Sequence, residues 1–313
     1  MNNFINICKM TQPEVKAYMK QRLTELKYEV IDEDGFLYAK GDVPVLLVAH
    51  MDTVHKKQCA DVIVTDAHIS SPQGIGGDDR CGVYIISEIV KEKHCSVLLC
   101  EDEEIGTVGA RKFTKTDYIN NLDVNYMIEF DRRGNCDAVF YSCDNKDFTE
   151  FVLDATGFEK ATGSFSDISV LMTAAKIAGV NLSSGYYNAH TTTEYVVPAD
   201  MEMTIDAATI LIESECDEPF EYVAKKYDWS RPSSGYNYTG GYQFNFFRDY
   251  PTMTAAEVEL ENDEIELEAI ILDEMEVEQA VCVSGKTKAE CWMKFFLQNP
   301  SHSFDDIITY SWS

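Results

Sequence analysis

Histidine and carboxylate residues gather in five short segments, each directly after an expected strand or at the mouth of a loop. In chain order these segments are Ala49–Asp52, Gly76–Gly82, Glu101–Gly106, Phe130–Arg132 and Asn188–Tyr195. Each segment alone is typical of an ordinary polar loop or helix N-cap. Together they offer imidazole and carboxylate donors without thiolates, which suits divalent cations of the zinc type. Bound cations would also explain why so many acids converge, since acids alone repel one another.

A pair of cations indicates hydrolytic chemistry. Two metals a few ångströms apart need a bridging carboxylate and terminal ligands for each ion, and the five segments supply this set with one glutamate left over as a base. A metal pair lowers the pKa of bound water and polarises a carbonyl oxygen. A carboxylate within hydrogen-bond reach can then transfer the proton, for roughly 10²–10⁴-fold in rate. This machinery predicts hydrolysis of amide or peptide bonds.

The order of the segments resembles that of the co-catalytic zinc metallopeptidases, which include carboxypeptidase G, peptidase T, succinyl-diaminopimelate desuccinylase and related aminopeptidases. Their pattern is H-x-D, then D-D-[KR]-x-G, then E-E followed by Ile or Val and Gly, then an Asp, then a His. This chain reads HMD, DDRCG, DEEIGTVGA, EFD and NAHTTTEY. The resemblance covers roughly residues 40–215.

The resemblance implies which side chains would bind the ions. His50 and Asp131 would bind one zinc, Glu104 and His190 would bind the other, and Asp78 would bridge the two. It also implies two Zn²⁺ as the cofactor, with Co²⁺ or Mn²⁺ as possible substitutes.

The same resemblance implies the catalytic roles. Glu103 would be the general base, and Asp52 would hold the second ring nitrogen of His50 and so fix its tautomer. Asp79, the second acid of its pair, is not expected to bridge. We expect structural roles first for the remaining motif residues, Arg80 and Glu194.

The elements that must position these residues alternate between strands and helices. Strands are expected at Tyr28–Ile31, Phe36–Ala39, Val45–Ala49, Ser96–Cys100, Tyr126–Phe130 and Asp137–Ser142. Helices are expected at Thr11–Leu26, Cys81–Lys91, Val108–Phe113, Ser166–Ala178 and Asp200–Glu215. The pattern predicts a three-layer α/β fold with a mostly parallel central sheet flanked by helices, like that of zinc exopeptidases. In such sheets ligands gather at the carboxyl ends of strands.

The spacing between motifs indicates a difference from the carboxypeptidase G-like branch. Only 59 residues separate Asp131 from His190, whereas that branch inserts a lid and dimerisation domain there. The chain is therefore predicted to be a lidless catalytic domain, and the family's substrate class cannot be carried over. The loop 163–169 also resembles a family loop near the site, but we favour an ordinary helix N-cap at Ser166 or Asp167.

The charge of the chain narrows its partners and suggests a boundary. The sequence holds 54 acidic and 26 basic residues, a net charge of −28, which argues against nucleic acid or an anionic membrane as the main partner. Residues 211–313 carry 21 acids and 7 bases, half of the excess. We therefore predict a catalytic domain at 1–216 and an acidic, aromatic-rich extension at 217–313, which could recruit a protein partner or self-associate.

The extension is predicted to be a small α+β appendage. Strand-like alternation occurs at 258–261 and 265–268, and a strand at Val277–Val283 precedes a helix at Lys286–Leu297. The aromatic residues of 222–250 are expected to pack rather than to stack on a ligand.

The sequence also indicates a cellular compartment and a class of activity. The ten cysteines form no C-x-x-C pair, no apolar run approaches the ~20 residues of a membrane span, and no secretion signal is evident, so a cytoplasmic location is expected. The predicted activity is that of an aminopeptidase or a small-peptide amidohydrolase, acting on a small peptide or an acylated amino acid. Two alternatives stay open: a deacylase or deacetylase of a small molecule with the same metal site, and a catalytically idle binding protein that keeps the fold.

Overall fold

The computed structural model describes residues 1–65, 67–163, 165–225, 265–272, 278–285 and 307–312. The chain divides into two compact units, Met1–Ser230 and Arg231–Ser313. The first unit holds all five segments with candidate functional residues.

The first unit is built on an eight-stranded mixed sheet with parallel strands at its centre. The strand order is β1-β2-β6-β3-β7-β10-β8-β9, and β6, β3, β7 and β10 run parallel to one another. The strands are β1 (Val30–Glu33), β2 (Phe36–Ala39), β3 (Val43–His50), β6 (Cys95–Cys100), β7 (Tyr126–Arg132), β8 (Asp137–Val139), β9 (Glu159–Ala161) and β10 (Gly179–Ser183). Every residue of β6 is buried, as expected for a strand covered on both faces.

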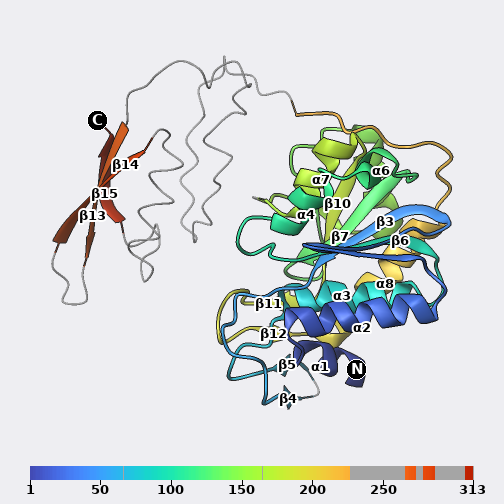
Figure 1. The fold of residues 1–313 in the computed structure, drawn as a ribbon, viewed down its shortest axis with the longest axis horizontal. Helices are drawn as coiled ribbons and strands as arrows, with labels where there is room; N and C mark the ends of the chain where they lie inside the picture. The colour runs from blue at the N-terminus through green and yellow to red at the C-terminus, as the bar shows by residue number, and fades with distance from the viewer. Residues whose placement is uncertain (66, 164, 226–264, 273–277, 286–306, 313) are drawn as a thin grey trace. The chain divides into compact units, whose positions relative to one another are not determined.

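Helices cover both faces of this sheet (Figure 1). On one side lie α1 (Asn2–Cys8), α2 (Gln12–Glu25), α3 (Gly77–Ile89) and α8 (Pro198–Glu213). The other side carries α4 (Val108–Phe113) and α7 (Asp167–Ala175), and the short α5 (Asp117–Asn120) and α6 (Lys146–Thr156) complete the unit. The predicted α/β fold, with a large central sheet between helices, is confirmed.

Several elements were predicted from local signals and others were not. Helix α2 begins where expected, because the Thr11 backbone N–H and hydroxyl both donate to Glu14 Oε2 at 2.8 Å. Helices α1, α5 and α6 and strands β9 and β10 were not predicted. Strand β10 has no continuous apolar run, because the fully buried Asn181 lies between Val180 and Leu182.

A small second sheet joins distant loops of the first unit. Its order is β11-β12-β5-β4, with β4 (Ile63–Val64), β5 (Ile69–Ser70), β11 (Tyr186–Tyr187) and β12 (Tyr195–Val196). Strand β12 pairs antiparallel with β5, so that Tyr195 lies opposite Ser70. This pairing links the segment that follows His190 to the segment that precedes Asp78.

The stretch between Asp131 and His190 continues the main sheet. It supplies β8, β9 and β10 together with α6 and α7. The first unit also extends beyond the predicted boundary at 216: Phe220 N donates to Asn125 O at 2.9 Å, and Lys225 N donates to Ser142 O at 2.8 Å.

The described part of the second unit is a three-stranded antiparallel sheet. Strand β13 (Ile265–Leu272) lies between β14 (Glu278–Gly285) and β15 (Ile307–Trp312). The expected strands at 265–268 and Val277–Val283 correspond to β13 and β14. The expected helix at Lys286–Leu297, the alternation at 258–261 and most of the aromatic tract lie outside the described residues.

Two general features concern the described residues as a whole. None of their helices has the length and apolar character that crossing a membrane requires. The described cysteines are free thiols, and most of them are buried.

A glycine in α4 makes a testable packing contact. A Cβ on Gly109 would lie 2.3 Å from Gly35 O and 2.6 Å from Glu101 N, both backbone atoms. We expect Gly109→Ala to lower the free energy of unfolding by about 2–3 kcal/mol, because backbone must move to relieve the clash. Urea unfolding measures this. Gly157→Ala, with φ +68° and no atom within 4 Å, is the control and should cost only about 1 kcal/mol; equal losses would contradict the packing argument.

Candidate metal centre

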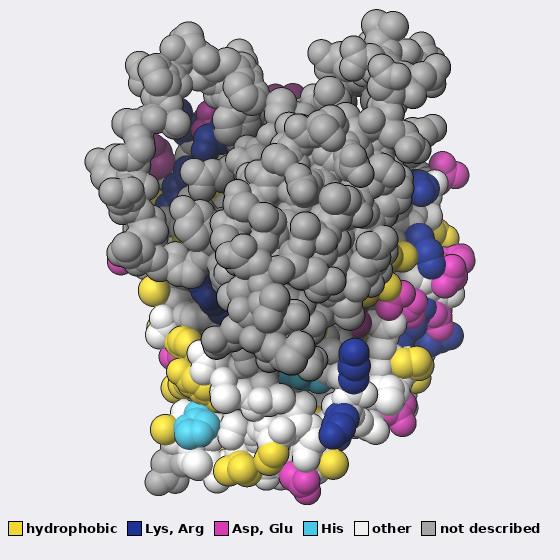
Figure 2. Space-filling view, turned by 90° about the vertical axis from the view of Figure 1, so that its left-hand side faces the viewer, with side chains coloured by type: hydrophobic (Ala, Val, Ile, Leu, Met, Phe, Trp, Pro, Cys, Tyr) yellow, Lys and Arg dark blue, Asp and Glu magenta, His cyan; other side chains and the backbone are white. Residues whose placement is uncertain are grey.

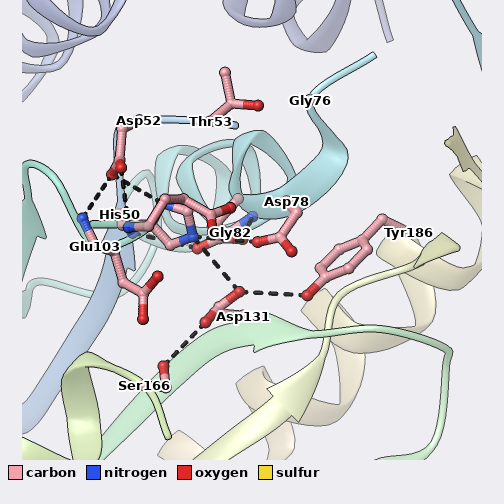
Figure 3. Close-up of polar contacts among 12 residues, drawn as sticks. His50, Asp52, Thr53, Gly76, Asp78, Gly82, Glu103, Asp131, Ser166 and Tyr186 are labelled. Carbon is pink, nitrogen blue, oxygen red and sulfur yellow. Dashed lines mark hydrogen bonds and ion pairs between the residues drawn. The ribbon is translucent and has the colours of Figure 1, made fainter. Parts of the chain in front are cut away.

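The candidate site lies at the carboxyl ends of the parallel strands (Figure 3). Strand β3 ends at His50, β6 leads into the loop with Glu103 and Glu104, and β7 carries Asp131 near its end. Because these strands run parallel, their carboxyl ends meet at one edge of the sheet. Helix α3 begins at the same edge and brings Asp78 to it.

All five expected metal ligands come together in two groups. His50, Asp78 and Asp131 form the first group, and Asp78, Glu104 and His190 form the second; within each, the candidate ligand atoms lie within 4.8 Å of one another. Asp78 belongs to both groups. Its Oδ1 lies 3.2 Å from His50 Nε2 and its Oδ2 lies 3.1 Å from His190 Nε2. One oxygen thus faces each group, which is the arrangement of a bridging carboxylate.

Asp52 connects the first group to the loop after β6. Its Oδ1 lies 3.1 Å from His50 Nδ1 and accepts a hydrogen bond from Glu103 N at 2.9 Å, while its Oδ2 accepts from Glu104 N at 3.1 Å. Burial raises the pKa of Asp52, but His50 and the two amides outweigh burial and lower it below its usual value. With Nδ1–H donating to Asp52, the Nε2 lone pair of His50 faces Asp78 and Asp131.

The two histidines balance part of the acidic charge. Contacts with Asp78 and Glu104 raise the pKa of His190 to about 11. Burial opposes protonation of His50, yet Asp131, Asp52 and Asp78 raise its pKa well above the usual value. Burial and the neighbouring Asp78 raise the pKa of Asp131 to about 7. Metal binding requires neutral imidazole, so cations would take over the charge balance that these protons provide.

The donor chemistry fits divalent cations of the zinc type. Each group combines one imidazole with two carboxylates, a donor set that zinc accepts. Glu104 Oε1 is buried and accepts no hydrogen bond with proper geometry, although His190 Nε2 lies 3.1 Å away. A buried oxygen without a hydrogen bond is costly in a folded protein, and a cation at this position would satisfy it.

Glu103 lies beside the two groups without joining either. Its side chain points toward the candidate metal ligands (Figure 3). Burial raises the pKa of Glu103 to about 9; the charges of Asp131, Asp167 and Glu104 add to the rise, whereas His50 opposes it. A carboxyl group that holds a proton so strongly next to candidate ligands is suited to proton transfer.

A chain of hydrogen bonds supports Asp131 from behind. Ser166 Oγ lies 2.9 Å from Asp131 Oδ2 and 2.5 Å from Glu129 Oε2. One hydroxyl proton cannot serve two carboxylates, so one of the two carboxyls must carry a proton. Burial raises the pKa of Glu129 well above its usual value, and its Oε1 already accepts from Ile168 N at 3.2 Å. We therefore expect Glu129 to carry the proton and to donate to Ser166, so that Ser166 donates to Asp131.

Residues outside the five segments also hold the site. Asp131 Oδ1 accepts a hydrogen bond from the Tyr186 hydroxyl at 3.3 Å, and the Asn181 side chain bonds both the N–H and the C=O of Asp131 at 2.8 and 3.0 Å. Sequence reasoning missed Tyr186, Asn181 and Glu129. It expected an N-cap at Ser166 or Asp167; Ser166 is the N-cap of α7, and its hydroxyl contacts the carboxyls of Glu129 and Asp131. The one available signal for Tyr186 was its place four residues before His190.

The other motif residues lie around the ligands. Asp79 is in neither metal group; its oxygens accept hydrogen bonds from His50 N at 3.3 Å and Gly82 N at 2.8 Å. Arg80 is buried, and its Nη2 donates to Met10 O at 3.1 Å. Glu194 is buried too and contacts the backbone of Asp78.

Comparison with known proteins identifies the fold. No family model and no curated protein matches the sequence. Among solved structures, the chain is similar to aminopeptidase PepT from Bacillus cereus (17% identity, TM-score 0.58, covering 68% of this chain and 96% of that one). It is also similar to a tripeptidase from Staphylococcus aureus (14% identity, TM-score 0.58, covering 68% of this chain and 96% of that one). A Zn-dependent exopeptidase from Parabacteroides distasonis is similar as well (14% identity, TM-score 0.50, covering 68% of this chain and 95% of that one). At these identities the likeness establishes the fold, which this chain shares with Zn-dependent exopeptidases, and no particular family.

The hydrogen-bond chain behind Asp131 predicts an asymmetric response to substitution. Glu129→Gln keeps a donor to Ser166 and an acceptor for Ile168, so its free energy of unfolding should stay within about 1 kcal/mol of wild type. Ser166→Ala leaves buried carboxyl oxygens without their partner and should cost about 1–3 kcal/mol. Urea unfolding with a chelator present measures both. Equal destabilisation would mean that Glu129 is ionised.

A second prediction concerns pH. Asp167 is fully buried, neither of its oxygens has a hydrogen-bond partner among the described residues, and burial raises its pKa to about 7. A raised pKa in the folded state means that stability from this group is lost as pH rises from about 4 to 7. Asp167→Asn cannot ionise, so relative to wild type it should gain on the order of 1–3 kcal/mol between pH 5 and pH 8. The free energies of unfolding of chelator-treated wild type and variant are measured in urea at both pH values. For the exposed control Asp154→Asn, the difference from wild type should not depend on pH. The same result for Asp167→Asn would contradict the prediction.

Proposed function

We propose that this protein is a metal-dependent hydrolase of peptide or other amide bonds, of the aminopeptidase or small-peptide type, that works with two zinc ions. The observation that carries the proposal is the sharing of Asp78 between two groups of three candidate ligands. The fold adds support, because similar solved structures are described as an aminopeptidase, a tripeptidase and a Zn-dependent exopeptidase.

The residues divide the work of binding. His50 and Asp131 would hold one cation, Glu104 and His190 would hold the other, and Asp78 would be shared by the two. Two such cations supply Lewis acidity that polarises an amide carbonyl and makes water a stronger acid.

Glu103 serves as the general base. Its carboxylate accepts a proton from the water that attacks the amide carbonyl carbon, and returns this proton to the nitrogen as the C–N bond breaks. Burial raises the pKa of Glu103 and so favours its protonated form. Cations at the two metal positions would lower this pKa and favour the ionised form that a base needs. Asp52 Oδ1 accepts a hydrogen bond from the backbone N–H of Glu103 at 2.9 Å. This contact fixes the backbone position from which the Glu103 side chain extends.

The cation that follows Asp131 in the sequence is paired within the protein. Arg132 follows the ligand Asp131 in the sequence, but its guanidinium is held by Asp137 Oδ2 at 2.8 and 3.0 Å. This cation is therefore engaged and does not offer its charge to a substrate carboxylate. In Figure 2, Lys and Arg side chains are mixed with Asp and Glu side chains on the visible part of the described surface. That part of the surface has no uniformly basic patch in this view.

Substitution of the base separates metal binding from catalysis. Glu103→Gln should keep two zinc ions per chain and lose about 10²–10⁴-fold in kcat, because the amide cannot accept the proton. The matched control is Asp102→Asn in the same loop, which keeps the Oδ1 acceptor for Gln12 Nε2 (3.0 Å) and should stay active. Elemental analysis and hydrolysis of aminoacyl amides, dipeptides, tripeptides and N-acyl amino acids measure the two properties.

The outcomes distinguish the rival functions. Wild-type protein that binds no metal would contradict the proposal as a whole, and full activity in metal-loaded Glu103→Gln would contradict the base. Preference for N-acyl amino acids over free peptides would favour the deacylase. Bound metal without hydrolysis of any member of the panel would favour a binding protein.

A further inference from the structure

The carboxylate of Glu194 lies where three loops with metal-binding residues meet. It is only 1% exposed. Its Oε2 accepts hydrogen bonds from Gly76 N at 2.8 Å and from His55 Nε2 at 2.8 Å, and its Oε1 accepts from Asp78 N at 3.1 Å. The three donors belong to the loop after β3, which begins at His50, and to the segment that opens α3 at Asp78.

Burial makes these contacts strong constraints. A buried carboxylate costs free energy unless hydrogen bonds and opposite charge compensate it. All three donors come from outside the β11–β12 hairpin that carries Glu194. The side chain therefore stabilises the contact between loops and not the hairpin itself. The His55 ring also packs closely against Gly74: a Cβ on Gly74 would lie 2.2 Å from His55 Cε1. This packing further holds the loop after β3 against the segment before α3.

The loop that carries His190 depends on this contact. His190 lies four residues before Glu194, has φ +64° and a side chain that is 48% exposed. The hydroxyl and backbone hydrogen bonds of the loop stay within it: Thr191 Oγ1 donates to Asn188 O at 2.8 Å, and Glu194 N donates to Thr191 O at 3.2 Å. Its position relative to Asp78 is set by the Glu194 carboxylate together with the pairing of β12 and β5.

The first metal position has separate supports. His50 and Asp131 lie on central strands of the main sheet. Asp78 is also held from its other side, because Asp79 accepts hydrogen bonds from His50 N and Gly82 N. Loss of Glu194 should therefore disturb the distance between Asp78 and His190 more than the distance between Asp78 and His50.

We infer that Glu194 is a positioning residue that builds the second metal position, formed by Asp78, Glu104 and His190, by joining the His190 loop to the Asp78 segment. This inference rests on the proposed function, since it assumes that both positions bind cations. It assigns to Glu194 a role in how many ions bind, beyond stabilising the fold.

The test counts metal ions and measures their affinities. Metal-free full-length protein is titrated with Zn²⁺ by calorimetry at constant pH. Wild type should bind two ions; Glu194→Gln should bind one ion within threefold of the wild-type affinity and the other at least tenfold more weakly, because an amide cannot accept from all three donors. His190→Ala gives the reference for a weakened second position. Glu202→Gln, an exposed change on α8 with the same loss of charge, should match wild type.

Each result bears on one claim. Two ions with unchanged affinities in Glu194→Gln would overturn the inference, and so would equal weakening of both positions. Wild-type protein that binds no zinc would instead contradict the proposed function. If Glu194→Gln does not fold, His55→Ala, which removes one donor and keeps the carboxylate, is measured in its place. It should weaken only the second position, by about threefold, and no change would overturn the inference.

Discussion

Repulsion among buried acids is the constraint on which the structure of the site depends. Asp78, Asp131 and Glu104 converge within a few ångströms at the edge of the sheet, and Glu103 and Glu129 lie next to them. Such a group is stable only when each negative charge is neutralised by a proton or a cation. Without metal, the raised pKa values of His50, His190 and Glu129 favour the protonated forms that neutralise these charges. Divalent cations bound by the same residues would neutralise them instead. Charge balance therefore links metal content, protonation and stability in one equilibrium.

The sheet and the loops contribute differently to this arrangement. Strands β3 and β7 place His50 and Asp131 on neighbouring parallel strands whose register is fixed along their length. His190 and Asp78 come from segments outside the central strands, and buried side-chain contacts replace the ladder of backbone hydrogen bonds there. Two of the five candidate ligands thus lie on strands of the core, and the other three depend more on side-chain contacts for their positions.

The sequence predicted what has a strong local signal. Long apolar runs identified β3, β6 and β7. The five candidate ligands that the fold brings together came from the resemblance of the histidine and acid motifs to those of the zinc metallopeptidases. Glu129 and Asn181 lie within buried strands, where nothing in the local pattern distinguishes a site residue from a structural one. Strands β4, β5, β11 and β12 have two residues each, too few for any periodicity. Their pairing depends on contacts between distant segments, which no local pattern encodes.

Asp52 has a consequence for how this site could change over time. A single carboxylate orients His50 in the first group and holds the backbone of both Glu103 and Glu104, the expected base and a ligand of the second group. Removal of this carboxylate would take a partner from all three residues at once. Metal affinity and proton transfer would then change together. New specificity is more readily acquired through the exposed loops, such as that of His190, than through the carboxylate beneath them.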